Sequence, residues 1–141
     1  VPCASLIHSV FVTDHLHRIE TAAQAANKVQ DILLEVNVSG EESKGGATVS
    51  DVPELLTQAL EFPHIRVCGL MTMAPQGDIA IARECFADLR ALRDSLNAGL
   101  PEQVEPLSEL SMGMSEDWQC AIEQGATIVR IGRAIFSEEF E

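Results

Sequence analysis

Leu110-Ser-Met-Gly-Met-Ser-Glu-Asp-Trp118, followed by Thr127-Ile-Val-Arg-Ile-Gly132, is a strand–turn–helix–strand pattern that predicts two neighbouring strand ends facing one anion. The first strand runs out into Gly113 and Ser115, and Ser115 occupies the expected N-cap position of a short helix. The second is a β-branched run that stops at Gly132, where the missing Cβ lets the backbone approach a ligand. Free backbone N–H groups at both ends would form a phosphate-binding cup.

Each of these motifs also has an ordinary structural interpretation. Serine at an N-cap and glycine after a strand are what any β/α protein uses to turn the chain. Glu116 and Asp117 argue against an anion, although carboxylates in a first helical turn can point to solvent. Arg130, on the strand itself, favours the phosphate interpretation.

Composition limits the classes of function. The 141 residues suit a single domain, and 22 acidic against 9 basic residues give a net charge of −13, which disfavours binding to nucleic acid or to an anionic membrane. We find no apolar run of the roughly 20 residues that a membrane span needs, and no signal peptide, so we expect a cytoplasmic protein.

Metal-binding patterns are also missing from the sequence. The four cysteines are scattered without a C-x-x-C pair, which predicts reduced, mostly buried thiols and neither a zinc site nor a disulfide framework. His15 and His17 are two residues apart and therefore face different sides of a helix, so we expect no metal.

Apolar runs alternate with helical patterns along the chain, which is typical of β/α units with a parallel sheet. Helices are expected over Asp14 to Lys28, from a cap at Ser50 with Pro53 in the first turn, and over Asp78 to Asn97, where Gly99 ends the helix. The expected strands are Leu6 to Val10, Ile32 to Val38, Ile65 to Met71, Leu107 to Ser111, and Thr127 to Ile131.

Six motifs at the expected strand ends follow one another along the chain. They are Leu6-Ile-His-Ser-Val10, Glu35-Val-Asn-Val-Ser-Gly-Glu-Glu-Ser-Lys-Gly45, Gly69-Leu-Met-Thr-Met73, Leu110-Ser-Met-Gly-Met-Ser115, Val129-Arg-Ile-Gly132 and Ala134-Ile-Phe136. In this order the motifs closely resemble the pyridoxal phosphate homeostasis protein family. The resemblance implies a (β/α)8 barrel related to the N-terminal domain of alanine racemase, which holds pyridoxal 5′-phosphate (PLP) as a Schiff base without a well-established reaction.

The resemblance also implies a cofactor site and its chemistry. Arg130 would face the pyridine nitrogen and keep it unprotonated, which weakens the ring as an electron sink. A non-catalytic PLP-binding protein of vitamin B6 homeostasis is therefore expected. The cofactor-binding residues implied are Met114, Ser115, Arg130, Ile131, Gly132 and Arg133.

Three departures from the family pattern modify this expectation. The family's Schiff-base lysine lies on the first barrel strand, whereas this chain begins at what looks like the fourth; only Lys28 and Lys44 are present. Phe11-Val12 replaces Asp-Ser after the first motif, and Ser137 replaces a glycine after the last. We therefore expect one N-terminally truncated PLP-binding domain over residues 1–141, with about five β/α units (strands 4 to 8) and non-covalent binding at best.

Five β/α units cannot close an eight-stranded barrel, so exposed sheet edges are expected around Leu6 to Val10 and Thr127 to Ile131. Self-association or pairing with a missing N-terminal half would cover them. Two alternatives stay open: an inactive fragment or half-barrel that needs an N-terminal partner, and an alanine-racemase-like amino acid racemase. The second would use a lysine and a tyrosine as bases, and the chain contains no tyrosine.

Overall fold

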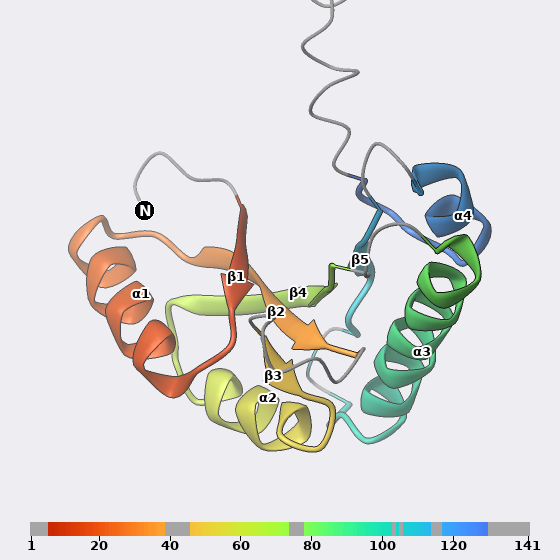
Figure 1. The fold of residues 1–141 in the computed structure, drawn as a ribbon. Helices are drawn as coiled ribbons and strands as arrows, with labels where there is room; N and C mark the ends of the chain where they lie inside the picture. Colours follow the sequence, from red (N-terminus) through yellow and green to blue (C-terminus); the bar gives the residue numbers. More distant parts are fainter. Residues whose placement is uncertain are drawn as a thin grey trace, which may run out of the picture.

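The computed structural model describes residues 6–38, 46–73, 78–102, 104, 106–113 and 117–129, apart from the side chains of His8 and Ser9. Strands and helices alternate along these residues, and α1, α2 and α3 form an arc along one side of the sheet (Figure 1). The elements are β1 (Leu6–Val10), α1 (Thr13–Ala25), β2 (Gln30–Asn37), β3 (Ala47–Thr48), α2 (Val52–Leu60), β4 (Ile65–Met71), α3 (Ile79–Ala98), β5 (Glu109–Ser111) and α4 (Trp118–Glu123).

All described strand pairs are parallel, as the alternation of strands and helices predicts. The sheet has the order β1-β2-β4-β5, and the short strand β3 pairs with the end of β2. Ile128 forms an isolated parallel bridge to Ser111, so the stretch after α4 continues the sheet beyond β5. The sheet is the partial, open form of a (β/α)8 barrel that the sequence analysis expected. None of the helices within the described ranges is both long and apolar enough to cross a membrane.

The main core lies between the sheet and the helices. Side chains alternate between the two faces of a strand, and on β2 they place Ile32, Leu34 and Val36 against the helices, where at most 1% of each is exposed. Burying such side chains contributes roughly 1.5–3 kcal/mol each. The opposite face of β2 therefore carries Asp31, Leu33, Glu35 and Asn37, a set in which only Leu33 is apolar. The helices contact one face of the sheet, and the second face is polar over much of β2.

α1 ends at Ala25, three residues before the predicted end at Lys28, whereas both ends of α3 lie where its sequence predicts. Asn27 has a positive φ of 55°, and the Lys28 N–H donates to the Ala23 carbonyl, which stops α1 before Lys28. α3 begins after Asp78, whose carboxylate accepts hydrogen bonds from the N–H groups of Ala80 and Ile81, and Gly99 is its C-cap as predicted.

Two predicted helix caps are wrong. α2 is capped at Asp51 instead of Ser50, because the Ser50 hydroxyl lies 3.2 Å from that of Thr48 and the Asp51 N–H closes a turn onto the Thr48 carbonyl. α4 is capped at Asp117 instead of Ser115, since its first bond runs from the Ala121 N–H to the Asp117 carbonyl at 3.0 Å.

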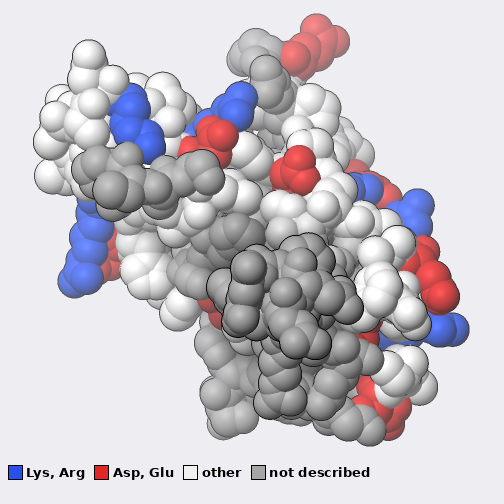
Figure 2. All heavy atoms as spheres, turned by 90° about the horizontal axis from the view of Figure 1, so that it is seen from above, with Lys and Arg blue, Asp and Glu red and all other residues white. Residues whose placement is uncertain are grey.

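Surface charges of opposite sign lie beside one another. Arg18 pairs with Asp14 at 3.0 Å along α1, and Arg83 of α3 reaches Glu123 of α4 at 3.4 Å. Figure 2 shows Lys and Arg interspersed with Asp and Glu on the face seen there, instead of gathered in one area. Such exposed pairs contribute about 0–1 kcal/mol each.

Candidate site at the carboxyl ends of the strands

The carboxyl ends of parallel strands share one edge of a sheet, and in β/α proteins this edge carries the ligand site. Here β2, β4 and β5 end at Asn37, Met71 and Ser111. The loops that the sequence analysis selected for a phosphate cup leave the sheet at this edge, after Ser111 and after Ile128.

Thr72 holds three strand ends together at this edge. It follows β4 directly and is 1% exposed. Its hydroxyl donates to the Val36 carbonyl of β2 at 2.7 Å, and its backbone N–H donates to the Ser111 carbonyl of β5 at 3.1 Å. Sequence reasoning quoted Thr72 only as part of a motif; a lone hydroxyl at the end of an apolar run is the signal that points to this role.

The two strand ends that lead into the predicted cup lie side by side. Ser111 bridges to Ile128, and the Met112 N–H donates to the Ile128 carbonyl at 3.0 Å. One residue earlier on each segment, the Thr127 hydroxyl accepts from the Leu110 N–H at 2.8 Å. Two loops that start from a bridged pair of residues begin at the same place, so both can contribute N–H groups to one small anion.

Gly113 makes the turn between β5 and α4 possible. Its φ is +103°, and a Cβ at this position would lie 2.7 Å from the Ala121 Cβ and 3.3 Å from the Trp118 Cα. Both the backbone conformation and the close approach of α4 therefore require glycine. This packing places the start of α4 against the end of β5.

The six predicted cofactor-binding residues lie outside the described residues. Their nearest described neighbours are Gly113 and Asp117, which flank the first group, and Val129, which precedes the second. The predictions that remain untested by the structure concern Met114, Ser115, Arg130, Ile131, Gly132 and Arg133.

Lys28 lies at the wrong edge of the sheet for a Schiff base. It follows α1 and precedes β2, so it is at the amino ends of the strands, about 25 Å along β2 from the carboxyl edge. Lys44, the other lysine, lies outside the described residues. Covalent attachment of a cofactor to Lys28 does not fit a phosphate held after Ser111 and Ile128.

Phe11 and Val12, which depart from the family motif, start α1 without a side-chain cap. Val12 is the N-cap residue and has no oxygen in its side chain to accept a hydrogen bond. Phe11 packs edge-on against His15 with ring centroids 4.9 Å apart, and its N–H donates to the His15 ring nitrogen at 3.3 Å. The departure is accommodated by the first turn of α1 and leaves the sheet intact.

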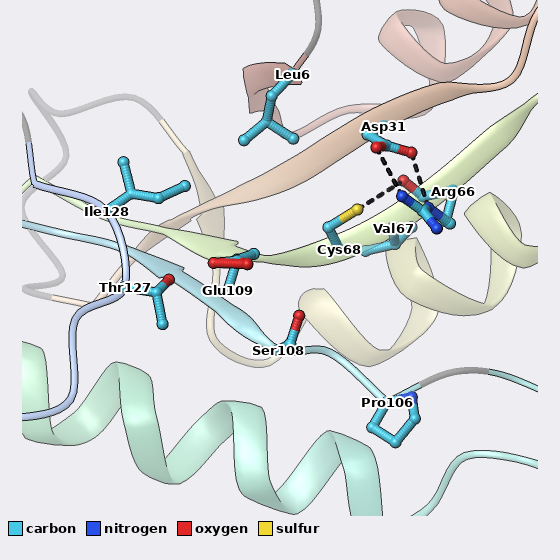
Figure 3. A pocket seen from close by; sticks show the side chains of 10 residues that line it. All are labelled: Leu6, Asp31, Arg66, Val67, Cys68, Pro106, Ser108, Glu109, Thr127 and Ile128. Atoms are coloured by element: carbon cyan, nitrogen blue, oxygen red, sulfur yellow. Dashed lines mark hydrogen bonds and ion pairs between the residues drawn. The ribbon is translucent and has the colours of Figure 1, made fainter.

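A second feature, missed by sequence reasoning, is a cavity of about 470 Å³ at the amino ends of the strands (Figure 3). Arg66 of β4 donates through Nε and Nη2 to the two carboxylate oxygens of Asp31 on β2, both at 2.8 Å. The available signal was a pair of charged residues at the starts of two apolar runs: Asp31 directly precedes the run Ile32 to Val38, and Arg66 is the second residue of the run Ile65 to Met71. We refer to this opening as the amino-end cavity; its lining residues are Leu6, Asp31, Arg66, Val67, Cys68, Pro106, Ser108, Glu109, Thr127 and Ile128.

The electrostatics of the amino-end cavity are dominated by its ion pair. The hydrogen bond and the charge of Asp31 raise the pKa of Arg66, so the guanidinium stays charged. Burial, followed by the negative charge of Asp31, raises the pKa of the Cys68 thiol. Cys68 is therefore a protonated, half-buried thiol, whereas Cys85 and Cys120 are buried.

Within the described residues, no group of three His, Cys, Asp or Glu side chains could hold a metal ion. His64 is held by Glu20 of α1: its ring Nδ1 lies 2.6 Å from the Glu20 carboxylate, and its backbone N–H donates to the same carboxylate at 2.9 Å.

Comparison with known proteins finds a matching family model and similar relatives for this sequence. The family model described as alanine racemase, N-terminal domain, matches residues 3–139. The pyridoxal phosphate homeostasis protein of Aquifex aeolicus is 46% identical over 134 residues, which are 94% of this chain and 58% of that protein.

Solved structures give the same result. An unknown protein from Bifidobacterium adolescentis is 38% identical with a TM-score of 0.87, over 96% of this chain and 54% of that one. PipY of Synechococcus elongatus, solved with PLP bound, is 31% identical with a TM-score of 0.84, over 94% of this chain and 61% of PipY. The chain thus spans between about half and three fifths of the length of these relatives.

Proposed function

This chain belongs to the alanine racemase N-terminal domain family, and we propose that it is the phosphate-binding part of a non-catalytic PLP-binding protein of vitamin B6 homeostasis. The observation that carries the proposal is the bridge between Ser111 and Ile128 at the carboxyl edge of the sheet. The similarity to pyridoxal phosphate homeostasis proteins and to a PLP-bound structure supports the choice of ligand.

The bridge supports a common anion site for the two loops. Ser115 is four residues beyond Ser111, and Gly132 is four residues beyond Ile128. Loops of equal length that leave from one bridged pair can converge on one phosphate. In the proposed site, the hydroxyl of Ser115 and the backbone N–H groups near Met114, Ile131 and Gly132 donate to the phosphate.

Arginines complete the proposed site. Arg133 contributes a cation at the rim of the phosphate cup, and Arg130 faces the pyridine nitrogen. Bound PLP supplies an electron sink when its ring nitrogen is protonated, and a permanently charged guanidinium beside that nitrogen opposes protonation. The proposed protein therefore stores or delivers the cofactor in the cytoplasm without turning over a substrate.

Binding in this chain is proposed to be non-covalent. Lys28, the lysine among the described residues, lies at the opposite edge of the sheet from the phosphate cup. A racemase of the alanine racemase type is a weaker proposal, because its two bases are a lysine and a tyrosine and this chain has no tyrosine.

The test is a titration of the chain with PLP, in which binding is measured by the absorbance of the cofactor. Pyridoxal, which lacks the phosphate, is the matched control ligand. We expect saturable PLP binding, at least tenfold weaker binding of pyridoxal, and competition by inorganic phosphate. Borohydride reduction and peptide mapping should find no stoichiometric attachment at Lys28. Equal binding of PLP and pyridoxal, or no binding of PLP, would refute the phosphate cup.

A further inference from the structure

One row of residues crosses the sheet at its carboxyl edge and ends at Glu35. Glu35 of β2 is in register with Met71 of β4, and Met71 is in register with Ser111 of β5. Ser111 in turn bridges to Ile128. The residue before each of the first three is a leucine of the helix-facing core, so the side chains of this row point to the other face of the sheet. The row therefore connects Glu35 with the two strand ends from which the proposed phosphate loops leave.

Glu35 is the charged member of this row. Met71 and Ser111 are 2% and 0% exposed, whereas Glu35 is only partly buried. In the part of the chain that the structure describes, no ion pair or hydrogen bond engages the Glu35 carboxylate. Asp31, on the same face of β2, lies four residues earlier, about 13 Å along the strand, and is paired with Arg66. A ligand at the carboxyl edge thus meets one negative charge on β2.

The backbone that leads into β3 confines the Glu35 side chain. A Cβ on Gly46 would lie 3.4 Å from the Glu35 Cγ and 2.9 Å from the backbone nitrogen of Asn37. The φ of Gly46 is +112°, a conformation that favours glycine. Gly46 therefore passes directly beside the stem of Glu35 and limits the directions in which the carboxylate can extend.

The proposed orientation of the cofactor turns its 4-position toward β2. Arg130, two residues beyond Ile128, is proposed to face the pyridine nitrogen, and the Ile128 segment continues the sheet on the side of β5 away from β2. C4 lies opposite the nitrogen in the ring, so its substituent points back across the sheet. β2 lies two strands from β5, which is a backbone separation of about 10 Å. The length of the cofactor and the side chain of Glu35 together can span this separation.

We propose that Glu35 is a specificity-determining residue of the cofactor site and selects the aminomethyl form, pyridoxamine 5′-phosphate (PMP). PMP carries an ammonium group at the 4′ position, which donates a charge-assisted hydrogen bond to a carboxylate. PLP carries an uncharged aldehyde there, beside a phenolate oxygen that a carboxylate repels. PMP also forms no Schiff base with the protein, so it needs no lysine at the carboxyl edge. This inference deepens the proposed function, because it names the form of the cofactor that the same site prefers.

The test compares the affinities of the chain for PMP, PLP and pyridoxine 5′-phosphate (PNP) by isothermal titration calorimetry. PNP has a neutral hydroxymethyl group in place of the aminomethyl group and is otherwise the same molecule, so the ratio of the PMP and PNP affinities isolates the charge at the 4′ position. We expect PMP to bind about tenfold more tightly than PNP, and more tightly than PLP. Equal affinities for PMP and PNP, or tighter binding of PLP than of PMP, would overturn the inference.

Two variants make the test specific to Glu35. Glu35→Gln keeps the size of the side chain and removes its charge, so the preference for PMP over PNP should fall to less than about threefold. Glu84→Gln, at an exposed position on α3, removes the same charge and should keep the preference of about tenfold. A general loss of structure would weaken both ligands alike and leave the ratio unchanged. An unchanged ratio in Glu35→Gln, or an equal fall in both variants, would overturn the role of Glu35.

The outcomes distinguish this inference from the proposed function. Inorganic phosphate should displace PMP and PNP alike, because both are held by the phosphate cup. Binding of both ligands without a preference would leave the phosphate cup in place and overturn the role of Glu35 alone. Binding of none of the three ligands would refute the phosphate cup, and the role of Glu35 with it.

Discussion

The two edges of the sheet use polar groups in opposite ways. At the carboxyl edge, Thr72 satisfies backbone groups of the neighbouring strands and draws the strand ends together. At the amino edge, Asp31 and Arg66 satisfy one another through side chains that project into a cavity. The first arrangement holds the starts of two loops beside one another, and the second leaves a charged cavity at the starts of the strands. The comparison supports the proposal that the phosphate of PLP binds at the carboxyl edge.

Disrupting the contact between β4 and β5 should have the largest effect on stability. A Cβ on Gly69 would overlap the Glu109 carbonyl, so Gly69→Ala should push β4 and β5 apart along their whole contact. We expect the free energy of unfolding to fall by more than about 3 kcal/mol, or the fold to be lost. Thermal unfolding measures this.

Gly99→Ala is the matched control for Gly69→Ala. A Cβ on Gly99 would meet nothing nearer than the Leu96 carbonyl oxygen at 3.7 Å, and the φ of Gly99 is −97°. Its effect should stay within about 1 kcal/mol. Equal unfolding temperatures for the two variants would contradict the close approach of β4 and β5.

The carboxyl edge is tested next by its cofactor variants. Ser115→Ala removes a donor to the phosphate and should weaken PLP binding about tenfold, equivalent to roughly 1.4 kcal/mol. Arg130→Gln should change the absorbance spectrum of bound PLP more than Ser115→Ala does, because Arg130 is proposed to face the ring. Ser50→Ala, at an exposed position on another loop, is the control. Equal spectral changes in all variants would refute the separate roles.

Removal of the Thr72 hydroxyl should have an effect of similar size on the same edge. Thr72→Val keeps the shape of the side chain and loses the hydrogen bond to the Val36 carbonyl. The expected loss is about 1–2 kcal/mol of unfolding free energy, with weaker PLP binding because the strand ends separate. Thr21→Val, whose exposed hydroxyl bonds to the His17 carbonyl within α1, should lose less than half as much. Denaturant titration measures the unfolding free energy of both variants. A larger loss of stability in Thr21→Val than in Thr72→Val would contradict the role of Thr72 in holding the strand ends together.

The smallest expected effect is at the amino edge. Asp31 is the second cause of the raised pKa of Cys68, after burial, because a nearby carboxylate disfavours the thiolate. Asp31→Asn removes that charge and should lower the pKa of Cys68 while burial keeps it above the ordinary thiol range. The pH profile of iodoacetamide labelling checks this. A shift to higher pH in Asp31→Asn would contradict the assigned sign.

Much of the fold is predictable because it depends on local patterns. The apolar runs define β1, β2 and β4 closely, and Asp78 and Gly99 define both ends of α3. The caps at Ser50 and Ser115 were mispredicted because several polar residues stand close together before each helix. At α2, a local contact between the Ser50 and Thr48 hydroxyls accompanies the cap at Asp51. β3 was missed because two residues are too few to form a pattern.

The site is predictable only in part, for a physical reason. The pairing of the motifs after Ser111 and Ile128 could be expected, since adjacent parallel strands end at one edge. The amino-end cavity could not, because the meeting of Asp31 and Arg66 depends on the register between β2 and β4 and on a bulge that follows it. The residues that would contact PLP remain predictions from the family resemblance.

Hydrogen exchange of the chain with and without PLP, followed by mass spectrometry, tests the division between the two edges most directly. We predict slower exchange in residues 110–117 and 129–133, with no change in residues 65–68 and 106–109. Protection of the latter segments in place of the former would place the cofactor in the amino-end cavity and contradict the account.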